Sequence, residues 1–309
     1  MNQQKMESIS FLRVISTCMI IICHFLQFYG NELAYWFNVG VQIFLLISGF
    51  LFGQKVIDKI GKFYKKRLLR ILVDYYLYII VVIPLYWIFH KEVISFYATI
   101  KQILCLSCLP GLNHLWFIRT IILCYLITPF LQKIFKNGKK EVFFGIEVFV
   151  FFIFITGKFF TSAWINCYIM GYFFGKQFKE RGNGVIKDFS RIAIPVAVIM
   201  NGSQIVVDYI LKLEFTGEWS YAFQVWTEYS HVFLAVAFFG IVMQLYKDKQ
   251  NMIYKDFLNF FDRHSYDIYI VHHIYILGPF SLLSQDKLGG GENCVCSSNN
   301  SINSPNTYE

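Results

Sequence analysis

The chain has 309 residues, of which 56% are hydrophobic and 19% aromatic, and its formal net charge is +8. Apolar runs of membrane-spanning length exclude a soluble globular protein, and their lack of polar–apolar alternation excludes an outer-membrane barrel. The positive charge does not indicate a nucleic-acid partner, because the basic residues lie in short loops between the apolar runs. We therefore predict an all-α, polytopic transmembrane helical bundle embedded in a lipid bilayer.

The apolar runs predict about nine membrane spans. Their approximate positions are 9–27, 35–53, 71–89, 114–132, 142–157, 162–175, 192–211, 229–246 and 265–283. Stretch 93–109 is too interrupted for a span, and we predict an interfacial or re-entrant segment there. Residues 284–309 are polar and rich in Gly, Ser and Asn, which predicts a disordered tail behind a membrane domain formed by 1–283. With the N-terminus in the cytoplasm, most Lys and Arg residues fall on the cytoplasmic side, as positive-inside topology requires.

The first span, FLRVISTCMIIICHF, contains Arg13 and His24, eleven residues apart. Eleven residues of α-helix end roughly 20° past three full turns, so both side chains lie on one stripe, about 16 Å apart along the axis. Ionisable groups that face hydrocarbon are penalised by several kcal/mol. We therefore predict that this stripe faces protein or a cavity.

The second span is followed by the basic stretch FYKKRLLRI. Arg67 and Arg70 are three residues apart and share one helical face, with Lys66 beside them. Paired guanidinium groups suit a phosphate-bearing ligand. The alternative is a positive-inside anchor that contacts lipid headgroups. The spacing of Cys105 and Cys108 in CLSC is weak evidence for metal chemistry in this apolar setting, and we expect no metal site.

Several motifs, in order along residues 1–283, resemble those of the acyltransferase-3 family of integral-membrane acyltransferases, which includes bacterial polysaccharide O-acetyltransferases. The resemblance is carried by Arg13-x10-His24, VQIFLLISGFLFG, KRLLRI, NHLWFIRTIILCYLITPFL and SYDIYIVHH. Two features depart from the family pattern. Val73 and Asp74 stand where a proline often follows the Arg-x-x-Arg element, and the family usually has one span more, which suggests a truncated or frame-shifted chain.

The resemblance implies a multi-pass O-acyltransferase of the bacterial plasma membrane that takes an acetyl group from acetyl-CoA on the cytoplasmic side. Arg67, Arg70 and Lys66 would bind the CoA phosphates, and Arg13, His24 and His272 would be catalytic. His24 would act as a base or carry the acyl group. The acceptor would be a hydroxyl of a capsular or envelope polysaccharide, or of a lipid-linked glycan.

Other readings of the same residues remain open. Intramembrane Arg, Asp and His also mark the pathways of transporters and flippases, although no internal repeat is evident. An inactive acyltransferase remnant that lacks its last span is the third alternative. We expect His273 to point away from His272 and to serve packing, and His114 to be either an interfacial anchor or part of an acceptor site.

Overall fold

The computed structural model describes residues 3–89, 95–109, 111–137, 140–157, 161–246, 252–277 and 281–283. Within these ranges the chain is helical and has no strand. The helices are α1 (Gln3–Phe28), α2 (Ala34–Phe37), α3 (Val39–Gly53), α4 (Ile60–Phe89), α5 (Phe96–Ile103), α6 (Trp116–Ile134), α7 (Lys140–Gly157), α8 (Thr161–Arg181), α9 (Asn183–Ile205), α10 (Gly217–Leu245) and α11 (Met252–Ile276). Short 3₁₀ turns at Asn113–Leu115 (η1) and Phe135–Asn137 (η2) flank α6, and a π-helical turn at Val206–Leu211 (η3) extends α9.

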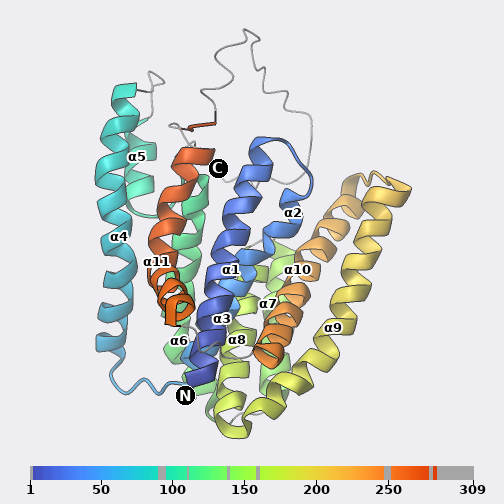
Figure 1. Cartoon of the computed structure of the whole chain (residues 1–309). Coiled ribbons are helices and arrows are strands. Elements are labelled where there is room, and N and C mark those ends of the chain that lie inside the picture. The colour runs from blue at the N-terminus through green and yellow to red at the C-terminus, as the bar shows by residue number, and fades with distance from the viewer. Residues whose placement is uncertain are drawn as a thin grey trace.

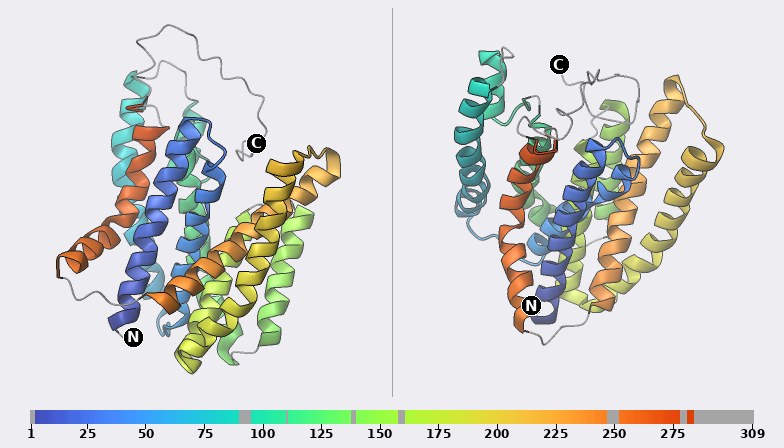
Figure 2. Two further views of the ribbon diagram at one scale, coloured as in Figure 1. Left: turned by 45° about the vertical axis from the view of Figure 1, so that its right-hand side comes forward. Right: turned by 45° about the horizontal axis from the view of Figure 1, so that its top comes forward.

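The long helices form one bundle, with α4 and α5 at one side and α9 and α10 at the other (Figures 1 and 2). In Figure 1 and in the right-hand view of Figure 2, α11 lies between α4 and α1. The N-terminal ends of α1, α4 and α11 lie at one end of the bundle, at the bottom of Figure 1. We call this the basic end, because it carries Lys55, Lys66, Arg67 and Arg70.

Six segments are long and apolar enough to cross a membrane, which confirms the polytopic membrane class. They are Glu7–Phe28, Ala34–Gly53, Ile60–Leu85, Asn113–Ile134, Asn183–Leu211 and Gly217–Leu245. Helices also form at the other three predicted spans, in α7, α8 and α11, but these do not meet the same criterion within the described residues. The predicted number of about nine spans is therefore not confirmed.

Two of the remaining sequence predictions concern segments outside the spans. Stretch 93–109 contains the short helix α5 in the part that the structure describes, in keeping with a segment too interrupted to span the membrane. The predicted tail 284–309 lies outside the described residues.

Helices α3 and α8 approach closely enough for their backbones to touch, and glycine permits this. A Cβ added at Gly49 would lie 2.1 Å from the carbonyl oxygen of Tyr168, and one at Gly53 would meet the α8 backbone just as closely. Gly171 and Gly175 of α8 face the α3 backbone in the same way. Each helix thus carries two glycines four residues apart, the small-residue spacing that favours close helix packing in membranes. The close contact between α3 and α8 lies at the centre of the bundle and holds α3 beside α1.

Candidate active site

The Arg13–His24 stripe of α1 faces α11, which confirms that it does not face lipid. At the basic end, Lys255 of α11 forms an ion pair with Glu7 at 2.9 Å. Further along, Arg13 pairs with Asp262, and His24 meets the imidazoles of His272 and His273. Since α1 and α11 run in the same direction, similar spacings on the two helices bring these contacts into register (Figure 1).

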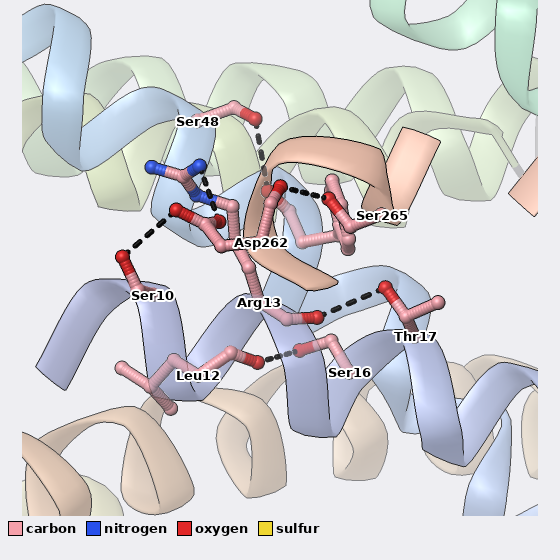
Figure 3. A network of polar contacts seen from close by, with 9 residues as sticks. Ser10, Leu12, Arg13, Ser16, Thr17, Ser48, Asp262 and Ser265 are labelled. Carbon is pink, nitrogen blue, oxygen red and sulfur yellow. Dashed lines mark hydrogen bonds and ion pairs between the residues drawn. The ribbon is translucent and has the colours of Figure 1, made fainter. Parts of the chain in front are cut away.

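Arg13 belongs to a polar network that joins the two helices (Figure 3). Its Nη1 donates to Asp262 Oδ1 at 2.6 Å, and the Ser10 hydroxyl donates to Oδ2 at 2.8 Å. The Ser265 hydroxyl donates to the Asp262 carbonyl oxygen at 2.9 Å. The Arg13 and Asp262 side chains are 27% and 16% exposed, so both charges are largely removed from solvent. A hydrogen-bonded pair of this kind compensates each buried charge and fixes the register of α1 against α11.

Four histidines gather near the other end of these helices. The ring centroid of His24 lies 5.1 Å from that of His272 and 4.8 Å from that of His273. His114 of η1 stacks on His273 at 4.3 Å and meets His272 edge-on at 5.8 Å. The hydroxyl of Tyr269 donates to the His114 carbonyl oxygen and ties η1 to α11. We call His24, His114, His272 and His273 the histidine cluster.

In three of these imidazole rings, a neighbouring carbonyl or amide oxygen determines which nitrogen carries the proton. His114 Nε2 lies 2.9 Å from the Ile270 carbonyl oxygen, and His272 Nδ1 lies 2.7 Å from that of Tyr269. A carbonyl oxygen only accepts, so each of these nitrogens must carry the proton. His24 Nδ1 lies 2.7 Å from Gln27 Oε1, which assigns its proton in the same way. The opposite nitrogen of each neutral ring is then a proton acceptor.

The free nitrogens differ in accessibility. His114, His272 and His273 are at most 8% exposed. His114 Nδ1, His272 Nε2 and His273 Nδ1 are buried and have no hydrogen-bond partner among the described residues. His24 is only half-buried, so it is the member of the cluster that a substrate reaches most readily. Among the described residues, no group of three or more His, Cys, Asp or Glu side chains is arranged to hold a metal ion.

The predicted phosphate-binding residues lie at the basic end, around the ring of Phe52 at the end of α3. The Arg67 guanidinium carbon lies 4.7 Å from the centroid of this ring and the Lys55 ammonium 5.8 Å from it, both within cation–π range. Lys66 and Arg70 are exposed beside them. Partial burial, followed by the charges of Arg67, Lys66 and Arg13, lowers the pKa of Lys55. These cations therefore act on one another across the loop between α3 and α4.

The structure changes the expected site in three ways. Arg13, which the resemblance predicts to be catalytic, is held in an ion pair with Asp262. The prediction that His273 points away from the site is wrong, since its ring lies edge-on to His24. Asp262 was missed by sequence reasoning. One available signal was its spacing, because it precedes the paired histidines of α11 by ten residues, much as Arg13 precedes His24.

Comparison with known proteins identifies the family of the chain. A family model described as an acyltransferase domain matches residues 6–289, which include the Arg13 network, the basic end and the histidine cluster. No curated protein and no solved structure matches the chain significantly. The chain belongs to the acyltransferase-3 family of membrane acyltransferases.

Proposed function

We propose that the protein transfers an acetyl group from acetyl-CoA to a hydroxyl of a cell-envelope or capsular polysaccharide, or of its lipid-linked precursor, in a bacterial plasma membrane. The observation that carries this proposal is the half-buried His24, whose Nδ1 is held by Gln27 and whose Nε2 is left to accept a proton. A neutral imidazole placed in this way is suited to activate a hydroxyl near neutral pH.

The donor is expected to bind at the basic end, on the cytoplasmic side. Arg67, Arg70, Lys66 and Lys55 offer guanidinium and ammonium donors to the phosphates of CoA. Lys55 extends the predicted set, since it shares the Phe52 ring with Arg67. From this end the thioester would pass along α1 toward His24, about 16 Å beyond Arg13.

The proposed acetyl transfer takes place at the histidine cluster. His24 Nε2 takes the proton of the acceptor hydroxyl while the oxygen attacks the thioester carbonyl carbon. The carbon–sulfur bond breaks, the acetyl group stays on the acceptor oxygen, and the CoA thiolate takes the proton from the imidazolium. His272 lies beside His24, and its Nε2, which has no partner in the part of the chain that the structure describes, would accept a hydrogen bond from the acceptor or from the imidazolium. Arg13 is a positioning residue in this scheme, because its pairing with Asp262 holds α1 in register with α11.

The test compares the native chain, His24→Ala and His231→Gln in a host that lacks its own copy. His231 is a matched control, since it is equally a membrane histidine but packs on Tyr35 at 4.1 Å, away from the cluster. O-acetyl groups on purified polysaccharide are measured by proton NMR, and vesicles are assayed with and without acetyl-CoA. We expect His24→Ala to lose at least about 100-fold in rate and His231→Gln to stay close to native. A well-inserted native chain with no acetyl-CoA-dependent acetylation would refute the proposal.

A further inference from the structure

A groove of about 570 Å³ runs between α4 and α11, on the side of α11 that faces away from α1. It lies within the size range of ligand sites. Toward the basic end, the hydroxyl of Tyr266 donates to the Ile71 carbonyl oxygen at 3.1 Å and links the two helices at the base of the groove. Above this tie the groove extends from Asp74 and Asp267 to Leu85 and Tyr275.

The walls of the groove are apolar and open toward the bilayer. Leu77 is 62% exposed, Val81 57% and Val271 39%, although all three line the groove. These exposed side chains would lie against hydrocarbon in a membrane. The apolar, exposed walls therefore suit a lipid chain that lies along α4.

The base of the groove is polar. A surface that only contacts bulk lipid has no need of polar side chains. Asp74 and Asp267 are carboxylates on two different helices that both line the groove. Asp267 is also 3.0 Å from His264, and Arg70 acts electrostatically on Asp74. Ionisable side chains at membrane depth are costly and mark functional sites. Two carboxylates repel a phosphate and accept hydrogen bonds from hydroxyl groups.

The back wall connects the groove with the histidine cluster. Tyr78 is only 9% exposed, and its buried hydroxyl has no hydrogen-bond partner among the described residues. Its ring meets His114 at 6.2 Å. Tyr78 lies one turn beyond Asp74 on α4 and lines the same groove, so its side chain separates the carboxylate end of the groove from His114.

We propose that this groove binds a neutral, sugar-bearing lipid, with its hydrocarbon chain between α4 and α11 and its hydroxyls on Asp74, Asp267 and Tyr78. The acceptor then enters sideways from the bilayer and presents a hydroxyl past Tyr78 to the histidine cluster. This inference rests on the proposed function for the acceptor role, but the binding itself is measured separately.

The binding test uses the full chain in phosphatidylcholine vesicles. One probe is a monoglucosyl diacylglycerol with a diazirine in one acyl chain, and the comparison probe is phosphatidic acid with the same chain. After illumination, labelled peptides are mapped by mass spectrometry. We expect the glucosyl probe to label the peptides that contain Leu77–Leu85 and Ile270–Tyr275, several-fold more than the phosphatidic acid probe. Equal labelling by both probes, spread over all lipid-facing helices, would overturn the proposal.

Variants sharpen the test. Val81→Trp and, independently, Leu77→Trp fill the groove from exposed positions and should remove the labelling. Ile80→Trp is the matched control, because Ile80 is 67% exposed on the same helix but does not line the groove. Asp74→Asn with Asp267→Asn should remove the preference for the glucosyl probe. Persistent labelling after both groove-filling changes would also contradict the proposal.

The acyl-transfer assay distinguishes a failure of the proposed function from a failure of the proposed lipid site. Specific labelling without acyl transfer refutes the proposed function and leaves the lipid site standing. Transfer to a lipid-linked acceptor that depends on His24 but is unaffected by Val81→Trp refutes the groove as its entrance and leaves the acyltransferase standing.

Discussion

The contact between Arg13 and Asp262 is the most directly testable feature of the α1–α11 interface. A charge-assisted hydrogen bond contributes about 1.5–3 kcal/mol, and breaking a fully buried pair costs about 3–5 kcal/mol. The two side chains are 27% and 16% exposed, so solvent screens the pair in part. We therefore expect Asp262→Asn to lower the free energy of unfolding by about 2–3 kcal/mol. Ser10 adds to this loss, because its hydroxyl donates to the same carboxylate at 2.8 Å.

The assay is a double-mutant cycle in mixed detergent micelles, with unfolding followed as the denaturing detergent is increased. Arg13→Gln combined with Asp262→Asn should recover part of the loss, with a coupling energy of about 1–3 kcal/mol. The ion pair between Arg181 and Asp188 is the control, since it is equally short at 2.8 Å but 46% and 49% exposed. Asp188→Asn should cost less than about 1 kcal/mol. Strictly additive effects at Arg13 and Asp262 would refute the claim that this pair holds the two helices in register.

Three further predictions concern the packing and the chemistry of the site. Gly49→Ala should destabilise the bundle by about 1–3 kcal/mol in a thermal unfolding assay, whereas Gly145→Ala, with no atom within 4 Å of the added Cβ, should be nearly neutral. The pKa of Lys55 is lowered, so its ammonium loses its charge at a lower pH than a free lysine, and CoA binding measured by titration calorimetry should weaken as the pH rises through that value. Lys55→Arg should retain its affinity there, because a guanidinium stays charged. Identical pH profiles for the native chain and Lys55→Arg would contradict this prediction. Gln27→Ala should reduce the acetylation rate by about tenfold, which is less than the loss caused by removing His24 itself. Gln27→Glu should restore the rate, because its carboxylate also accepts a hydrogen bond. An unchanged rate in Gln27→Ala would show that Gln27 Oε1 does not orient the His24 ring.

Hydropathy located the helices well and their ends poorly. The apolar run 71–89 predicted α4, but the helix begins at Ile60, because the basic turns before it continue the helix beyond the hydrocarbon. In the same way α10 begins at Gly217 rather than at 229. Apolar composition reports the thickness of the hydrocarbon region, whereas helix length follows backbone hydrogen bonding, which continues into the interface.

The part of the candidate site that lies on a single helix could be predicted from the sequence. The contacts between two helices could not. Helical geometry placed Arg13 and His24 on one protected stripe, but it cannot name the helix opposite. Successive residues of a helix are about 100° apart, which favoured the view that His272 and His273 cannot serve one site. In the structure the ring of His24 meets both of them, with centroid distances of 5.1 Å to His272 and 4.8 Å to His273.

Within the described residues, α11 does not meet the apolar criterion, because charged and other polar side chains interrupt it. One face of the helix carries Asp262 and His272 toward α1, while another carries Asp267 toward the groove with α4. A helix surrounded by lipid would bear the full cost of these groups, but α11 lies between two other helices that pair or shelter them. Local rules of sequence are expected to fail where function requires it. The polar residues of α11 are therefore the ones on which the proposed function and the proposed lipid groove both depend.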